Sequence, residues 1–140
     1  MNLVAVQQKV AERVREIPIL SGLPVFAEEF GNVVENVQNA VARQCFCVVV
    51  GSPSFSDESP DSSICFGSAS VVVSVFENPA LNRRVSGRPS YLAAAQEVAK
   101  ALKLFDTGDG ILTSPVIADP TDLGEGVVSV TVTLKTKVTL

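Results

Sequence analysis

The clearest pattern in the chain is a regular alternation of apolar and polar residues close to its end. From Val128 to Lys135 every second residue is valine or leucine, and the residues between them are serine, threonine or lysine. Period two over this length predicts a β-strand with one face on the core and the other facing solvent or a partner. Thr131 and Thr133 on the polar face are therefore candidate partner contacts, and a terminal strand of this kind is a good surface for sheet extension between subunits.

Four earlier segments also have strand patterns. The run Cys45–Val50 is apolar on both faces, which predicts a central buried strand. Ser68–Glu77 has one fully apolar face made of Ala69 and alternate valines. Leu23–Ala27 fits a short strand. Ile111–Ala118 contains Pro115, which predicts an edge position or a bulge.

Three segments carry apolar residues at helical spacing, namely Asn2–Glu16, Glu29–Gln44 and Tyr91–Phe105. Each has a stripe of valine, leucine, alanine or phenylalanine at intervals of three and four, so each predicts an amphipathic helix. Ser90 fits the N-cap of the third helix. The second helix is rich in valine, so most of its stability must come from packing that stripe.

The predicted element order is α-β-α-β-β-α-β-β. It indicates an α+β fold in which a mostly antiparallel or mixed sheet carries about three helices on one face. A length of 140 residues predicts a single domain over positions 1–140.

One connection differs in composition from the rest of the chain. Residues Ser52–Ser63 are rich in serine and proline and include Asp57, Glu58 and Asp61. The segment lacks the glycine and terminal glutamate of an EF-hand loop, so a flexible, solvated acidic loop is favoured over a cation site. Long loops in small domains are either functional or disordered.

Two other connections allow more than one interpretation. Asp106–Gly110 resembles half of a calcium loop, but its glycines and aspartates are also typical of a tight turn, which we favour. Arg83, Arg84 and Arg88 precede a predicted helix. They fit contacts to an anion or to a partner's carboxylates, because guanidinium groups bind both, and they fit a solvated loop equally well.

Composition narrows the chemistry further. The chain contains no histidine and no tryptophan. Histidine is the commonest general base and zinc ligand, so Ser-His-Asp and Cys-His nucleophiles and most zinc sites are excluded. Cys45, Cys47 and Cys65 offer three thiolates without a fourth ligand, and buried apolar cysteines are favoured. We therefore expect no catalytic, cofactor-binding or metal-binding residues, and a protein that is not an enzyme.

Charge and hydropathy bear on partners and location. The formal net charge of −4 disfavours nonspecific binding to nucleic acid, which usually needs a basic stripe. No stretch approaches about 18 consecutive apolar residues, so no transmembrane helix is expected. The N-terminus lacks the pattern of a signal peptide, and the odd number of cysteines fits a reducing cytosol.

The order of elements, together with several short motifs, resembles a known family. The strand Cys45–Val50 runs into Gly51-Ser-Pro, and after the acidic loop a valine-rich strand ends in Phe76-Glu-Asn-Pro79. Leu81-Asn-Arg83, an alanine-rich helix and a C-terminal β pair follow. This arrangement resembles the small tail terminator, or tail completion, proteins of long-tailed bacteriophages and prophages.

The resemblance implies a structural protein without catalytic residues. Members of that family form a ring, typically of six subunits, which caps the tail tube and presents a surface to the head connector. The implied partners are further copies of the chain, the tail tube protein and a connector or neck protein. The implied locations are the host cytoplasm during assembly and then the virion tail. The acidic ring surface of the family would map onto Asp57, Glu58 and Asp61, where the Ser/Pro-rich loop departs from the family pattern.

Three alternatives stay open. The first is a neighbouring neck or head–tail joining protein with a related fold. The second is a small metal- or anion-binding module or enzyme that uses the 106–110 turn and the 83–88 loop. The third is an intracellular adaptor that pairs through its C-terminal strand.

Overall fold

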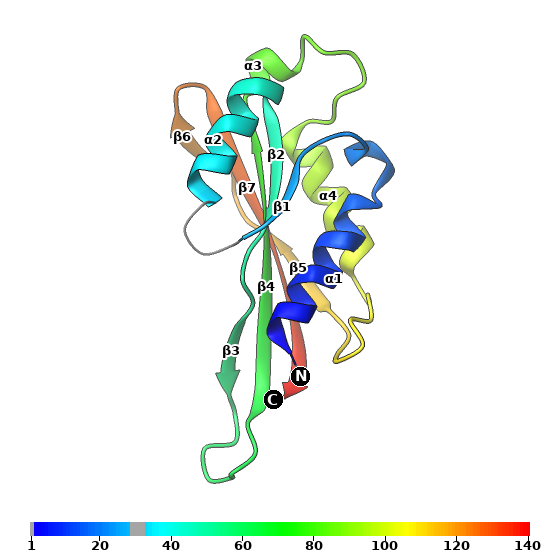
Figure 1. The fold of residues 1–140 in the computed structure, drawn as a ribbon, viewed down its shortest axis with the longest axis vertical. Helices are drawn as coiled ribbons and strands as arrows, with labels where there is room; N and C mark the ends of the chain where they lie inside the picture. Colours follow the sequence, from blue (N-terminus) through cyan, green and yellow to red (C-terminus); the bar gives the residue numbers. More distant parts are fainter. Residues whose placement is uncertain (1, 29–32) are drawn as a thin grey trace.

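A computed structural model describes residues 2–28 and 33–140 (Figure 1). These residues form four α-helices, one 3-10 turn and a seven-stranded sheet, so the predicted α+β class is confirmed. The elements in chain order are α1 (Leu3–Arg15), η1 (Pro18–Leu20), β1 (Val25–Ala27), α2 (Val33–Gln44), β2 (Phe46–Val50), β3 (Ser54–Asp57), β4 (Phe66–Glu77), α3 (Pro79–Asn82), α4 (Tyr91–Leu102), β5 (Thr113–Ile117), β6 (Thr121–Gly124) and β7 (Val127–Thr139).

Two long antiparallel strands form the axis of the molecule. β4 and β7 pair continuously from Phe66 opposite Thr139 to Glu77 opposite Val128. The sheet order is β1-β2-β4-β7-β5, with β3 also paired to β4 and β6 also paired to β7. Only β1 and β2 run parallel among the described strands, so the sheet is mixed, as expected.

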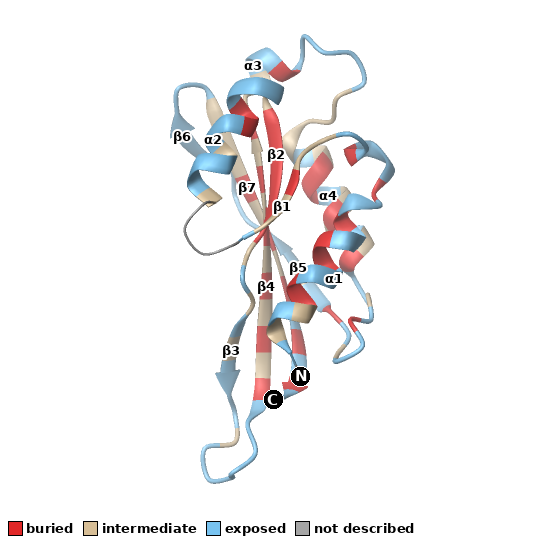
Figure 2. Cartoon of the chain, in the orientation of Figure 1, coloured by how far each residue is buried: buried red, intermediate tan, exposed pale blue. Residues whose placement is uncertain are grey.

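Helices α1 and α4 cover the first face of this sheet. Figure 2 shows their buried sides turned toward the strands. The period-two prediction for β4 holds, because its alternate residues from Ala69 to Val75 are fully buried. Val130, Val132 and Leu134 of β7 join them in the same core. Ser90 caps α4 through a hydrogen bond from the Ala93 amide to its hydroxyl (3.1 Å), as predicted. Asn2 caps α1, which was not predicted.

Helix α2 lies on the opposite face, which corrects the expectation that all helices share one face (Figure 1). Ala40 and Val41 of α2 pack on Cys47 of β2 in a second, smaller core. All five residues of β2 are buried, because the strand is apolar on both sides and each side must be covered. The predicted start of this helix, residues 29–32, lies outside the described residues.

Several element boundaries also differ from the expectations. Residues 54–57 form strand β3 within the segment predicted as a loop, and β6 was not predicted. Helix α4 ends at Leu102, three residues early. β5 lies at a sheet edge with a register shift between Thr113 and Val116, as Pro115 predicted. No helix in the described ranges has the length and apolar character needed to cross a membrane.

Candidate interaction surfaces

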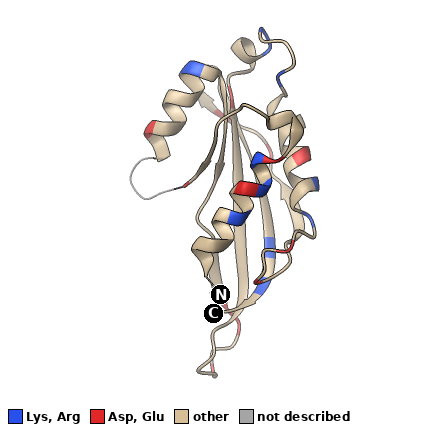
Figure 3. Cartoon of the chain, turned by 45° about the vertical axis from the view of Figure 1, so that its right-hand side comes forward, with Lys and Arg blue, Asp and Glu red and all other residues tan. Residues whose placement is uncertain are grey.

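The predicted site residues fall in three separate places. Asp57, Glu58 and Asp61 lie at or near the tip of the long β3–β4 hairpin, at the bottom of Figure 1. The arginines of the 83–88 segment lie at the opposite end of the molecule, in the connection from α3 to α4 (Figure 3). Thr131 and Thr133 lie on β7, on the same sheet face as α2. The structure thus places the acidic and basic groups at opposite ends and does not bring them together.

A polar cluster holds the acidic hairpin against β7. The Nζ of Lys137 donates hydrogen bonds to both carboxylate oxygens of Glu58, at 2.7 and 2.6 Å. The Ser68 hydroxyl donates to the same carboxylate at 2.6 Å. Asp57 accepts hydrogen bonds from the backbone and the hydroxyl of Ser59 and so shapes the turn. Asp61 is exposed and makes no hydrogen bond or ion pair within the described residues, so it is the carboxylate available to a partner.

These contacts predict the titration behaviour of Glu58. Hydrogen bonds from Lys137 first, and from Ser68 second, hold the pKa of the Glu58 carboxyl below its ordinary value. The contact therefore stabilises the hairpin fully above the ordinary glutamate pKa of about 4.3. That stabilisation is lost as the pH falls through the lowered value. We expect Lys137→Gln to raise the pKa of Glu58 in an NMR titration. Lys135→Gln, two residues away on the same face of β7, is expected to leave it unchanged, and equal effects of the two would contradict the contact.

A buried carboxylate anchors the arginine-bearing segment. Glu77, the last residue of β4, is fully buried and accepts hydrogen bonds from the Asn82 side chain and from the Tyr91 amide (3.0 Å). Asn82 also donates to the Pro89 carbonyl at 2.9 Å. Both residues lie in the motifs named above, but no role was predicted for either. The sequence pattern does indicate that Glu77 is buried, because it continues the alternation of Val71, Val73 and Val75 on the buried face.

The three arginines differ in their surroundings. Arg88 donates a hydrogen bond to the Gln44 carbonyl at 2.7 Å and so ties the segment to the end of α2. Arg83 and Arg84 are exposed and make no side-chain hydrogen bond or ion pair within the described ranges. Arg88 is thus partly structural, whereas Arg83 and Arg84 keep their guanidinium groups accessible.

The position of β7 corrects the idea of a terminal strand with a free edge. β7 lies inside the sheet, with β4 along one edge and β5 and β6 along much of the other. Thr131 and Thr133 are half-buried and lie opposite Ser74 and Val72 of β4. Sheet extension therefore has to use another strand, and the two threonines are available only through the face they share with α2.

An apolar groove on that face was not predicted. Two adjoining hollows, of about 570 and 490 Å³, lie between α2, β4 and the β6–β7 hairpin. Val37, Gln38, Phe76 and Leu123 line both, so we treat them as one feature, the α2–sheet groove. Val34 and Leu123 leave 68% and 52% of their surface exposed there. The groove exists because α2 covers only part of its sheet face.

The residues proposed for a metal or anion site do not converge. The Asp106 carboxylate accepts a hydrogen bond from the Gly108 amide at 2.8 Å, and Gly108 has a φ of +88°, as in the tight turn we favoured. This turn and the 83–88 segment lie beyond opposite ends of α4, a 12-residue helix about 18 Å long. Within the described ranges, no group of three or more His, Cys, Asp or Glu residues is arranged to hold a metal ion.

The three cysteines differ in how far they are buried. Cys47 is buried in the second core, and burial raises the pKa of its thiol to about 12. Cys65 is exposed at the hairpin tip, and Cys45 is half-buried. The interpretation of buried apolar residues thus holds for Cys47 and is wrong for Cys65.

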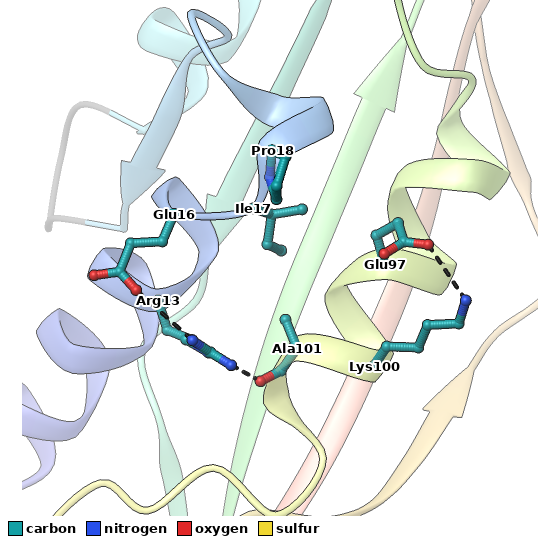
Figure 4. Close-up of a pocket in the computed structure, with 7 residues that line it drawn as sticks. All are labelled: Arg13, Glu16, Ile17, Pro18, Glu97, Lys100 and Ala101. Carbon is teal, nitrogen blue, oxygen red and sulfur yellow. Dashed lines mark hydrogen bonds and ion pairs between the residues drawn. The ribbon is translucent and has the colours of Figure 1, made fainter.

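A cleft between α1 and α4 carries charged residues, but they are satisfied locally (Figure 4). Arg13 donates to the Ala101 carbonyl at 3.2 Å and lies 3.7 Å from Glu16. Lys100 pairs with Glu97 on the same helix at 3.4 Å. The Arg13–Ala101 contact joins the two helices, and each of the other charged groups that line the cleft pairs within its own segment.

Comparison with known proteins gives a likeness in fold. No protein-family model matches the sequence, and no curated protein matches it. Among solved structures, one chain of a structure titled "Virion of native gene transfer agent (GTA) particle" aligns with a TM-score of 0.58 and 17% sequence identity. The alignment covers 96% of this chain and 94% of that chain. This protein therefore shares its fold, over nearly the whole length of both chains, with a chain of a gene transfer agent virion.

Proposed function

We propose that this protein is a non-enzymatic structural component of a phage-like particle. Its role is to form a ring that caps the tail tube and joins it to the head connector. The ring has six subunits, as the family resemblance implies. The observation that carries the proposal is the fold likeness to a chain of a gene transfer agent virion, which spans nearly all of both chains.

Two features of the chain support this role. The motifs that resemble tail terminators, Phe76-Glu-Asn-Pro79 and Leu81-Asn-Arg83, belong to the network around Glu77 that positions Arg83 and Arg84. The surface also offers features that suit subunit contacts, namely an acidic hairpin tip, exposed arginines and an apolar groove. Sizeable exposed apolar surface on a small protein commonly marks a protein–protein interface.

The proposal predicts the phenotype of a deletion. Removing the gene from the phage or prophage that carries it is expected to leave tail tubes longer than normal and heads without tails, because tube growth is no longer stopped. Negative-stain electron microscopy of lysates gives tube lengths and the fraction of joined particles. Expression of the wild-type chain in trans is expected to restore both.

A control variant shows whether complementation tolerates a surface change outside the proposed contact surfaces. Lys103→Glu changes an exposed charge away from all three surfaces and is expected to complement the deletion as well as wild type does. Particles of normal length and normal joining in the deletion strain would contradict the proposed function. So would purified wild-type particles in which mass spectrometry detects no copy of this chain.

A further inference from the structure

The tip of the β3–β4 hairpin exposes apolar side chains far from the core. We define the hairpin tip as residues 57–66 together with Leu140, whose amide donates to the Cys65 carbonyl at 2.8 Å. Ile64, Phe66 and Leu140 leave 58%, 43% and 47% of their surfaces exposed. Three large apolar residues together at the end of a projecting hairpin are costly to hydrate and are typical of a contact surface.

The α2–sheet groove is the complementary hollow on the same chain. Its upper end is lined by Ala42 and Leu81, and Arg83 and Arg84 follow Leu81 by two and three residues, just after α3. Both arginines are exposed and unpaired within the described residues, whereas Arg43 of α2 lines a different hollow, with Leu23 and Phe26. Two glutamates also line the groove, but Glu28 accepts a hydrogen bond from the Ser52 amide and only Glu125 lies at the arginine end. The exposed guanidinium groups of Arg83 and Arg84 thus follow directly on the residues of that end, whereas the hairpin tip carries Asp57 and Asp61.

The two surfaces of one copy cannot reach each other. Phe66 at the tip and Phe76 in the groove belong to the same strand, β4, and are ten residues apart. At about 3.3 Å per residue they are separated by about 33 Å along a strand that pairs with β7 throughout. The hairpin projects away from α2 (Figure 1), so the tip cannot enter the groove of its own chain.

We propose that the hairpin tip of one copy binds in the α2–sheet groove of a second copy. Ile64 and Phe66 enter between Val37, Phe76 and Leu123, and Asp61 faces Arg83 and Arg84. The contact joins two different surfaces of the same chain, so it is heterologous and closes into a ring when the rotation between copies allows. It deepens the ring proposed above and rests on it, because it names the two surfaces through which the subunits would join.

Disulfide cross-linking tests this contact with a cysteine that the chain already has. Cys65 is exposed at the tip, and Leu123→Cys places a second thiol on the exposed rim of the groove. The purified variant, oxidised at high protein concentration, is expected to form a ladder of dimers, trimers and larger covalent species on non-reducing gels. Each copy then carries one tip thiol and one groove thiol, whereas a Cys65–Cys65 bond alone stops at a dimer.

Two control variants make the ladder specific. Leu104→Cys introduces an even more exposed thiol after α4, away from the groove, and is expected to give no species beyond the wild-type pattern. Adding Cys65→Ser to Leu123→Cys removes the tip thiol and is expected to abolish the ladder. Equal ladders from Leu104→Cys and Leu123→Cys, or none from Leu123→Cys, would overturn the contact.

Charge reversal tests the orientation of the tip. In the Leu123→Cys background, Arg83→Glu with Arg84→Glu is expected to slow cross-linking about tenfold, since charges at an interface rim act mainly on association. Adding Asp61→Arg restores the opposite signs and is expected to recover most of the rate. Lys103→Glu, a charge reversal away from the tip and the groove, is the control and is expected to leave the rate unchanged. No slowing by the arginine reversals, or no recovery with Asp61→Arg, would contradict the proposed orientation.

The outcome is distinguishable from failure of the proposed function. A ring detected by light scattering or native mass spectrometry, in a protein that gives no Leu123→Cys ladder, would refute the tip-in-groove contact and leave the tail role standing. A specific ladder in a protein whose gene deletion leaves tails normal would refute the tail role and leave the tip-in-groove contact standing.

Discussion

Asn82→Ala is expected to lower the free energy of unfolding by about 3 kcal/mol, which is a large effect for one side-chain amide. Asn82 is 1% exposed, and its amide donates to the fully buried carboxylate of Glu77 and to the Pro89 carbonyl. Without that amide, Glu77 keeps the Tyr91 amide as its remaining hydrogen-bond donor in the described structure. Urea unfolding followed by circular dichroism measures the change.

A double-mutant cycle identifies the cause of this loss. Glu77→Ala alone is expected to cost about as much as Asn82→Ala, because it leaves the Asn82 and Tyr91 donors buried with fewer acceptors. The double variant is expected to cost about 2 kcal/mol less than the sum of the two, since each change removes the same contact. Asn39→Ala, on the exposed side of α2, is the matched control and is expected to stay within about 0.5 kcal/mol of wild type. Additive effects at Glu77 and Asn82 would contradict a shared network.

Gly67→Ala is expected to detach β3 from β4 while the rest of the sheet stays folded. A Cβ at Gly67 would lie 1.9 Å from the Ser56 carbonyl oxygen and 3.0 Å from the Glu58 backbone nitrogen. Both are backbone atoms of the facing segment, so neither can move aside as a flexible side chain would. Hydrogen exchange read by mass spectrometry is expected to show the Glu58 amide, which donates to the Phe66 carbonyl, exchanging about a hundredfold faster.

The matched control for Gly67→Ala is Ser70→Ala, three residues along β4. Ser70 lies opposite Ser54 of β3 on the sheet face that carries α2. The alanine Cβ would occupy the position of the serine Cβ and so causes no new contact with the backbone. Peptides from β3 are expected to keep wild-type exchange in Ser70→Ala, and peptides from β7 to keep it in both variants. Under the tip-in-groove contact, Gly67→Ala also removes the Leu123→Cys ladder. Wild-type protection of the hairpin in Gly67→Ala would contradict the backbone clash.

The elements that the sequence predicted correctly are those whose pattern is complete within one segment. β4 and β7 show period two over many residues, and α1 and α4 show apolar stripes with polar caps at Asn2 and Ser90. Pro115 indicated an edge strand or a bulge because proline has no backbone N–H to donate to a neighbouring strand. These signals are local, so they can be interpreted without knowing what the element packs against.

The elements that were missed owe their structure to a partner strand. β3 has the sequence Ser-Phe-Ser-Asp, with a single apolar residue, and β6 has Thr-Asp-Leu-Gly. Neither pattern predicts a strand. Each segment nevertheless pairs with a long strand, β4 or β7, which extends past its other neighbouring strands and there offers backbone groups for pairing. Of the candidate site, the sequence identified the acidic tip and the arginines, but it did not identify the groove or the role of Glu77.

By itself the sequence determined the longer helices and strands and which of their faces are apolar, because side-chain periodicity encodes both. Only the tertiary structure decided which element covers each face and which strand lies beside which. Backbone hydrogen-bonding edges are the same for every strand and carry no residue-specific signal, so the internal position of β7 is not encoded locally. The apolar stripe of α2 likewise does not specify which face of the sheet it covers. The position of α2, and the groove beside it, therefore follow only from the assembled sheet.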